Sequence, residues 1–302
     1  MAFPRHITIL RQLHELFPIL FFALSWLIIT RKSADSATLP MKVFILIWCK
    51  NPANANNSLL TFRTLRTGFP SLEVVVYDNA SIIGDQVQRL CQQVGAKYFR
   101  LNKEIRHHEF LKLVILNEPN AILLDPDIIF WEQVEHWDFS NYLIAGRLIP
   151  NFYDRYTRCH TVRRLHSSLM WLPDLKQLRS HFAQKAARYF DPIMHQTAII
   201  GSEWVFWDTL AGLYHVFKDQ SHCFGDRELN AYDHLFCGTH LDLVIDDIGA
   251  DSVIAKGSRM AMEDIASLKG YWRRQDEYLA ANPSPFLDRL FESGPNQSVP
   301  RK

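Results

Sequence analysis

Two carboxylates directly follow a short apolar run near the middle of the chain. The run spans residues 121–124, and the carboxylates belong to Asp125-Pro126-Asp127. Oxygen ligands of this kind suit Mg²⁺ or Mn²⁺, which can keep open coordination positions for the phosphate oxygens of a substrate. Roughly one Asp-x-Asp is expected by chance in a chain this long, so the position of the motif decides its meaning. We expect Asp125 and Asp127 to be ligands of a divalent cation.

The motif ends the fourth strand in an alternating series of predicted strands and helices. Short apolar runs rich in β-forming residues predict the strands, and apolar residues at helical spacing predict the helices. The alternation indicates a parallel sheet with right-handed crossovers. We therefore predict an α/β fold, with a mostly parallel, Rossmann-like sheet flanked by helices. The predicted strands are 43–48, 72–77, 97–101 and 121–124, and the predicted helices are 58–68, 83–94 and 107–117.

A second polar turn follows the strand predicted over 72–77. It reads Asp78-Asn79-Ala80-Ser81. The carboxyl ends of parallel strands share one edge of a sheet, and open α/β sheets bind their ligands along that edge. We therefore expect Asp78 and Asp125 to face the same crevice. The alternative is that the carboxylate of Asp78 only caps the backbone of its own turn.

The regular alternation decays after Asp127. We predict a strand over 142–145 and an irregular stretch over 147–170 that is rich in Arg, His and Tyr. Beyond it, we predict helices over 174–189, 228–236 and 268–281 and a strand over 241–245. The segment from Pro283 onward is rich in proline, and we expect a flexible tail over 283–302.

Three motifs together resemble those of a family 2-type glycosyltransferase with the GT-A fold, over residues 41–245. Val74 to Ser81 resembles a strand followed by the family's Asp-Asn-Gly-Ser turn, with Ala80 in place of the glycine. Leu123 to Asp127 resembles the Asp-x-Asp motif. Gly225-Asp226-Arg227-Glu228-Leu229 resembles the Glu-Asp-x-Asp-Leu motif, with glycine in place of the first glutamate. The resemblance implies one GT-A-like domain, 41–282, whose C-terminal portion binds the acceptor.

The resemblance implies a role for each matching residue. Asp78 and Asn79 would contact the base or ribose of a nucleotide-diphosphate sugar. Asp125 and Asp127 would hold the metal that bridges its diphosphate. Asp226 would be the base that deprotonates the acceptor hydroxyl, which predicts an inverting reaction; a helix-capping role is the alternative for this residue.

Other residues are candidates for the same site. Arg106 follows the third strand and would contact a phosphate. The resemblance implies that a histidine after the third motif completes the metal site, and His240 is a better candidate than His234. A histidine ligand favours Mn²⁺ over Mg²⁺. Two further acids are reserves for the base, namely Asp233 and Glu203. A weaker candidate for anion binding is a group of four arginines: Arg155, Arg158, Arg163 and Arg164.

Two other functions stay open. A nucleotidyltransferase that forms a sugar nucleotide would use a similar sheet and metal, but it normally has a glycine-rich loop after its first strand. The corresponding residues, 51–57, contain no glycine. A non-catalytic sugar- or nucleotide-binding module would carry Asp-x-Asp as a structural turn. Neither G-x-G-x-x-G nor a P-loop motif follows the first strand.

Composition sets limits on the partners. Lys and Arg total 33 and Asp and Glu total 32, a net charge of +1 with no basic run, so we expect no nucleic-acid partner. The five cysteines have no metal-binding spacing, and reduced thiols in the cytoplasm are the expectation. The partners that we expect are the sugar nucleotide and a carbohydrate or lipid-linked acceptor.

Residues 1–40 form an N-terminal extension with its own character. Residues 16–29 are apolar apart from Pro18 and Ser25, which is shorter than the roughly 20 residues of a membrane-spanning helix. Two interpretations stay open: a short anchor that gives peripheral or single-anchor membrane association, or a natural start at Met41.

Overall fold

The computed structural model describes residues 40–155, 157–185, 193, 195–235 and 264–292. The chain divides into two compact units, Met1–Leu39 and Pro40–Lys302, and the described residues belong to the second. Within the described ranges, every helix is too short or too polar to cross a membrane.

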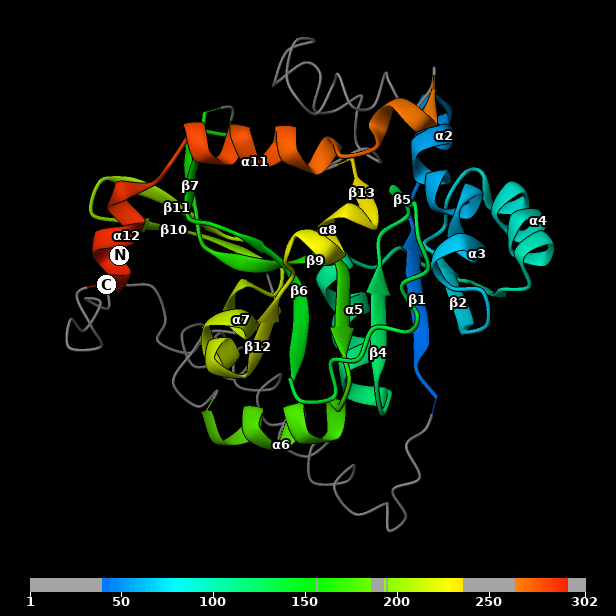
Figure 1. Cartoon of the computed structure of the whole chain (residues 1–302), viewed down its shortest axis with the longest axis horizontal. Helices are drawn as coiled ribbons and strands as arrows, with labels where there is room; N and C mark the ends of the chain where they lie inside the picture. The colour runs from blue at the N-terminus through cyan, green and yellow to red at the C-terminus, as the bar shows by residue number, and fades with distance from the viewer. Residues whose placement is uncertain (1–39, 156, 186–192, 194, 236–263, 293–302) are drawn as a thin grey trace, which may run out of the picture. The chain divides into compact units, whose positions relative to one another are not determined.

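A seven-stranded sheet forms the centre of the fold (Figure 1). Its strand order is β12-β6-β9-β4-β1-β2-β3, and all neighbouring pairs are parallel except the two made by β9. The predicted α/β class with a mostly parallel sheet is therefore confirmed. The strands are β1 Lys42–Ile47, β2 Glu73–Asp78, β3 Lys97–Arg100, β4 Ala121–Leu124, β6 Ile144–Ile149, β9 Arg164–Leu172 and β12 Ser221–Cys223.

Strand β1 shows how helices cover both faces of this sheet. Its side chains alternate between two cores: Val43, Ile45 and Ile47 enter one, and Phe44 and Leu46 enter the other. This alternation follows from the twofold repeat of a strand. The first core packs against α3 (Leu65–Gly68) and α4 (Gly84–Val94); the second packs against α5 (His107–Asn117), α6 (Leu175–Lys185) and α7 (Ala211–Phe217).

The helix predicted over 58–68 is broken into short segments. They are η2 Leu60–Arg63 and α3, and two more short helices, η1 Pro52–Asn54 and α2 Ala55–Ser58, precede them. The breaks let this stretch bind the chain after β4: the backbone N–H of Phe130 donates to Thr64 Oγ1 at 2.9 Å. In addition, a Cβ on Gly68 would lie 2.5 Å from the Phe130 ring, so the glycine permits the close approach.

Strand β9 is the largest difference from the sequence-based prediction. It lies antiparallel between β4 and β6, within the stretch predicted to be irregular. The apolar pattern is interrupted because Arg164, His166 and Ser168 occupy alternate positions. The same stretch also provides β7 (Phe152–Asp154) and β8 (Cys159–Thr161), which join β10 (Gln196–Ile200) and β11 (Glu203–Trp207) in a second sheet of order β10-β11-β8-β7.

A two-stranded sheet completes the site region. Strand β5 (Ile128–Phe130) pairs antiparallel with β13 (Tyr232–His234), and all three residues of each strand are buried. The helix predicted over 228–236 is wrong beyond α8 (Asp226–Asn230), because the buried pairing with β5 overrides local helix propensity. The strand predicted over 241–245 lies outside the described residues.

The C-terminal segment adds two helices, α11 (Tyr271–Ala281) and α12 (Pro285–Glu292), after a short turn, η6 (Ile265–Leu268). Helix α12 differs from the flexible tail expected from Pro283 onward. Its Leu287 is fully buried against Val162 and Val205, and Ser284 Oγ accepts a hydrogen bond from the backbone N–H of Leu287 at 3.2 Å. Apolar burial and this cap together account for the order of the helix.

The partial burial of His215 on α7 predicts a pH-dependent stability. Its ring centroid lies 5.2 Å from that of Trp207 and 4.9 Å from that of Phe291. Burial lowers its pKa to about 4, against a smaller opposing effect of its hydrogen bond to the Arg163 carbonyl. Between pH 6.5 and 4, the unfolded chain therefore binds a proton that the native protein does not, and stability falls as the pH falls.

Urea unfolding between pH 4.5 and 7.5 gives the free energy of unfolding as a function of pH. Its slope should be smaller in His215→Gln than in wild type, by up to the equivalent of one bound proton. The exposed His136 provides the matched control, and His136→Gln should leave the slope unchanged. Equal slopes for wild type and His215→Gln would contradict the assignment.

Candidate metal centre

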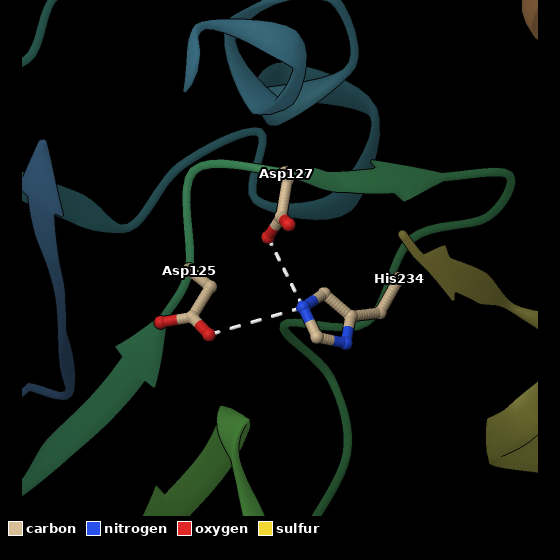
Figure 2. A group of neighbouring side chains, drawn as sticks. All are labelled: Asp125, Asp127 and His234. Carbon is tan, nitrogen blue, oxygen red and sulfur yellow. Dashed lines mark ion pairs between the residues drawn. The ribbon is translucent and has the colours of Figure 1, made fainter. Parts of the chain in front are cut away.

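Three side chains from two distant parts of the chain meet at the carboxyl end of β4. Asp125 and Asp127 flank Pro126 in the turn into β5, and His234 is the last residue of β13. The register pairs His234 with Ile128, the residue after Asp127. His234 Nε2 lies 3.1 Å from Asp127 Oδ1 and 3.9 Å from Asp125 Oδ2 (Figure 2). One potential ligand atom from each residue lies within 4.8 Å of the others.

The cluster is closed on one side and open on the other. The side chains of Asp127 and His234 are 3% and 4% exposed, whereas that of Asp125 is 24% exposed. Burial raises the pKa of Asp125; the charge of His107 opposes this, and the neighbouring Asp127 raises the pKa further. Two crowded carboxylates without a cation between them are electrostatically unfavourable. A bound divalent cation would relieve this repulsion.

The residues present fit such an ion. Two carboxylates supply hard oxygen donors, and His234 Nε2 faces both of them (Figure 2). The three potential ligand atoms need to move only slightly closer together for each to lie roughly 2 Å from a central ion. The nitrogen donor favours Mn²⁺ over Mg²⁺. An ion held here would act as a Lewis acid toward an anionic group that enters beside Asp125.

Thr61 fixes the backbone of the Asp-Pro-Asp turn. Its hydroxyl lies 2.9 Å from the carbonyl oxygens of both Asp125 and Ile128, and it accepts a hydrogen bond from the Ile128 N–H at 2.9 Å. The Thr61 N–H donates to the Pro126 carbonyl at 2.9 Å. On the other side, the Asp125 N–H donates to the Ser168 carbonyl of β9 at 2.7 Å. The turn is therefore held at every residue.

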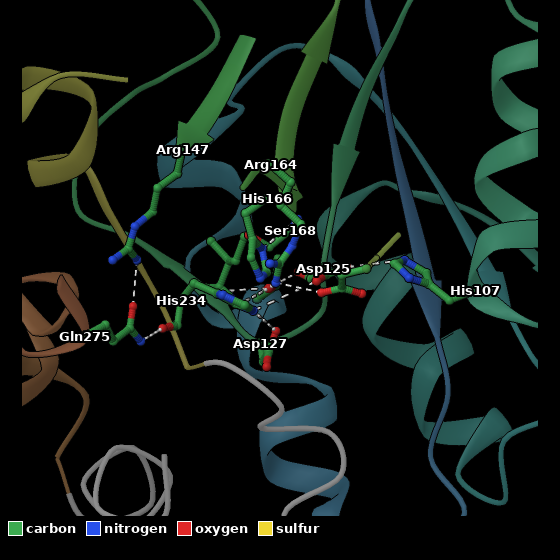
Figure 3. A network of polar contacts seen from close by, with 12 residues as sticks. His107, Asp125, Asp127, Arg147, Arg164, His166, Ser168, His234 and Gln275 are labelled. Atoms are coloured by element: carbon green, nitrogen blue, oxygen red, sulfur yellow. Dashed lines mark hydrogen bonds and ion pairs between the residues drawn. The ribbon is translucent and has the colours of Figure 1, made fainter. Parts of the chain in front are cut away.

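Strand β9 lines the cluster with a half-buried histidine, His166 (Figure 3). The His166 ring centroid lies 4.9 Å from that of His234. Burial, together with the nearby positive groups, lowers the pKa of His166 well below its usual value, so the ring is neutral. Its Nδ1 accepts the Ser168 backbone N–H at 3.2 Å, which places the ring proton on Nε2. His166 thus adds a neutral donor beside the metal ligands.

Helix α11 holds His234 from the opposite side (Figure 3). Gln275 is buried, donates through Nε2 to the His234 carbonyl, and accepts from Arg147 Nη1 at 2.6 Å. The preceding residue, Asp233, accepts the backbone N–H groups of Gly270 and Trp272, each at 2.8 Å. The position of the His234 imidazole therefore depends on α11.

Removing the Gln275 amide should weaken metal binding. We expect Gln275→Leu to lower Mn²⁺ affinity by roughly tenfold, because hydrogen bonds behind a metal ligand orient it. Isothermal titration with Mn²⁺ measures this, and Arg274→Leu on the exposed face of α11 is the matched control. An unchanged affinity in Gln275→Leu would show that α11 does not position His234.

The turn that the sequence predicts to bind nucleotide is held by hydrogen bonds within the protein. Asp78 is fully buried; its Oδ1 accepts the Ser81 N–H at 2.8 Å and its Oδ2 accepts the Tyr98 hydroxyl at 2.9 Å. The Asn79 amide is buried and bonds both the N–H and the carbonyl of Ile105. The Asn79 side chain therefore holds the loop before α5, and the Asp78 side chain holds its own turn against β3, which agrees with the alternative interpretation of Asp78 as a turn former.

Arg106 has an exposed side chain at the start of α5, where its backbone N–H donates to Glu109. The next residue, His107, comes closer to the cluster, with Nε2 3.7 Å from Asp125 Oδ1. A guanidinium suits phosphate, which is why the sequence favours Arg106, but the start of α5 directs His107 toward Asp125.

The candidate bases lie in different environments. Asp226 is exposed in the first turn of α8. Asp233 is buried and occupied by three N–H donors, including Trp131 Nε1 at 2.7 Å, so this reserve is a structural acceptor. Glu203 bonds His160 at 3.2 Å in the second sheet.

The predicted histidine ligand, His240, lies outside the described residues. The histidine in the cluster is His234.

Sequence reasoning missed the contribution of β9 to the cluster and the electrostatic influence of Asp208. The Asp208 charge raises the pKa of Asp125, and its Oδ2 pairs with Arg164 Nη2 at 2.6 Å. The spacing of Arg164, His166 and Ser168 at every second residue was the available signal. It indicates one face of a strand.

Comparisons with known proteins give only remote similarities. No protein-family model matches the sequence, and a search of curated proteins also finds no match. Among solved structures, the mannosyltransferase PcManGT from Pyrobaculum calidifontis, in complex with GDP-Man and Mn²⁺, is similar with 14% identity and a TM-score of 0.39. The alignment covers 95% of this chain and 89% of that one.

The glycosyltransferase GlyE of Streptococcus pneumoniae is 12% identical with a TM-score of 0.36; the alignment covers 71% of this chain and 52% of GlyE, so the chain spans about half of its length. The CTP:phosphocholine cytidylyltransferase LicC of Streptococcus pneumoniae is 13% identical with a TM-score of 0.34, over 49% of this chain and 78% of LicC. TM-scores this low assign neither a family nor an activity to the chain.

Proposed function

We propose that the protein is a metal-dependent glycosyltransferase that moves a sugar from a nucleotide-diphosphate sugar to an acceptor hydroxyl. The observation that carries the proposal is the convergence of Asp125, Asp127 and His234 at the carboxyl end of β4. In open α/β sheets, this edge is where ligands bind. The motif resemblance of the sequence supplies the reaction class.

The proposed chemistry requires two kinds of group. Departure of a nucleotide diphosphate develops negative charge, which a cation held by Asp125, Asp127 and His234 would neutralise. The acceptor hydroxyl must lose its proton, and Asp226 remains the candidate base for an inverting reaction. Its exposed position in α8 leaves the carboxylate accessible to a substrate.

The nucleotide would lie over the turn after β2, which shares the sheet edge with the metal cluster. Asn79 shapes this region through its two hydrogen bonds to Ile105, one residue before Arg106. A carbohydrate or lipid-linked acceptor would bind through the segments after Asp127. Membrane association through residues 16–29 stays an expectation, since that segment lies outside the described residues.

A nucleotide panel tests the proposal. Thermal unfolding with UDP, GDP, dTDP and CDP, each with and without Mn²⁺ or Mg²⁺, should show a stabilising shift for one nucleotide only when metal is present. That nucleotide would name the donor class. A metal-independent shift, or no shift with any nucleotide, would favour the binding-module or structural-turn interpretation.

A further inference from the structure

We infer that Arg164 forms an anion subsite beside the metal cluster and donates a hydrogen bond to a phosphate oxygen of the metal-bound diphosphate. This inference rests on the proposed function, because it names a contact within the same site. It concerns one arginine of the four that the sequence places close together.

The position of Arg164 follows from the pairing of β9. Leu169 to Leu172 pair with β4, so the earlier residues of β9 run past the end of β4, where Asp125 and Asp127 lie. The register of β9 against β6 shifts between Leu165 and Met170, so contacts rather than strict alternation place these residues. The His166 ring centroid lies 4.9 Å from that of His234, and Figure 3 shows Arg164 beside His166 at the cluster.

The guanidinium group is buried but not fully used. Arg164 is 6% exposed, and its Nη2 pairs with Asp208 Oδ2 at 2.6 Å. Its Nη1 is enclosed, and no described residue accepts a hydrogen bond from it. A buried donor without an acceptor is energetically costly, so most such groups in proteins have a partner. A ligand oxygen would supply the missing acceptor.

The surroundings favour an anion as that partner. A guanidinium matches phosphate oxygens in geometry and charge. The Asp208 and Asp125 side chains are 31% and 24% exposed, so a ligand can reach this edge of the cluster. Asp125, Asp127 and His234 would hold the cation, and Arg164 Nη1 would donate to an oxygen of the diphosphate that the cation binds.

The other three arginines of the group do not share these features. Arg155, Arg158 and Arg163 are exposed to solvent. Exposed arginines satisfy their donors with water, and they gain little by binding an anion. Arg163 is adjacent in sequence, precedes β9 and has an exposed side chain, so it provides the matched control for Arg164.

Titration calorimetry with inorganic diphosphate in the presence of Mn²⁺, and with Mn²⁺ alone, tests the inference. We expect Arg164→Gln to weaken diphosphate binding by about 10- to 100-fold, the range of a charged hydrogen bond, and to leave the affinity for Mn²⁺ alone nearly unchanged. Arg163→Gln should bind diphosphate like wild type. Asp208→Asn should bind it as well as or better than wild type, because it removes the competing carboxylate.

The Asp208 variant separates ligand binding from a purely structural ion pair. If Arg164 only holds Asp208, then Arg164→Gln and Asp208→Asn will weaken binding equally, and the inference is overturned. Any tightening in Asp208→Asn should disappear in the double variant with Arg164→Gln. If Arg164→Gln does not fold, weaker diphosphate binding in Asp208→Asn alone overturns the inference.

The proposed function and the inference fail in different ways. Absence of metal-dependent diphosphate binding in the wild-type protein would contradict the proposed function and the inference with it. Wild-type binding that Arg164→Gln does not weaken would contradict the inference alone.

Discussion

Replacing Asp127 by Asn is expected to abolish the metal-dependent stabilisation by nucleotide. The amide preserves the size of the side chain but removes the negative charge from the most buried carboxylate of the cluster. We expect the affinity for Mn²⁺ to fall by about 100-fold or more, since losing even a partner behind a metal ligand costs roughly 10- to 100-fold. The measurement is the melting temperature with Mn²⁺ and the preferred nucleotide.

The matched control is Asp138→Asn, an exposed aspartate whose Oδ1 accepts the Ser140 N–H at 2.9 Å. It should keep the full shift. A normal nucleotide shift in Asp127→Asn would exclude this carboxylate from the metal centre, whatever the behaviour of the control.

Replacing Thr61 by Val should affect both stability and metal binding. Valine keeps the shape of the side chain but leaves the buried Ile128 N–H and the Asp125 carbonyl without the hydroxyl partner. We expect a loss of about 2 kcal/mol in the free energy of unfolding. Because the lost contacts fix the Asp-Pro-Asp turn, Mn²⁺ affinity should also fall by about tenfold.

Urea unfolding and Mn²⁺ titration measure the two effects. Thr61→Ser retains the hydroxyl and should recover most of the metal affinity, although it loses a methyl group from the core. Thr197→Val on the exposed side of β10 is the surface control. If Thr61→Val loses stability but binds Mn²⁺ normally, then Thr61 stabilises the fold without positioning the ligands.

The sequence predicts the N-terminal half of the fold well because its strands are continuous apolar runs separated by clear helix signals. The helix over 107–117 and the strand over 121–124 coincide with α5 and β4. Gly95 ends α4 in a left-handed conformation, with φ of 65°, as its position predicts. The first two ligands follow from these elements, since Asp125 and Asp127 come directly after a recognisable buried strand.

The remaining parts depend on contacts between distant segments. Strand β9 carries Arg164, His166 and Ser168 on the face near the cluster, which removes the apolar pattern that would identify it. His234 becomes a potential ligand only because β13 pairs with β5, a contact across about one hundred residues. Local propensity in 228–236 favours a helix instead. The spacing of the three polar residues is a local signal of β9, whereas the pairing of β13 with β5 leaves none in the neighbouring sequence.

The buried state of Asp78 and Asn79 was also beyond local reasoning. The turn sequence predicts a polar loop, and polar loops are usually solvated. Here Tyr98, Ser81 and the Ile105 backbone satisfy the two side chains completely enough to bury them. Their burial depends on partners that only the folded sheet brings together.

The most direct test of the metal centre is diffraction from crystals soaked in Mn²⁺, recorded at the manganese absorption edge. We expect an anomalous peak enclosed by Asp125, Asp127 and His234, and the loss of that peak in Asp127→Asn crystals. A peak at another position, or no peak at Mn²⁺ concentrations that saturate nucleotide-dependent stabilisation, would contradict this expectation.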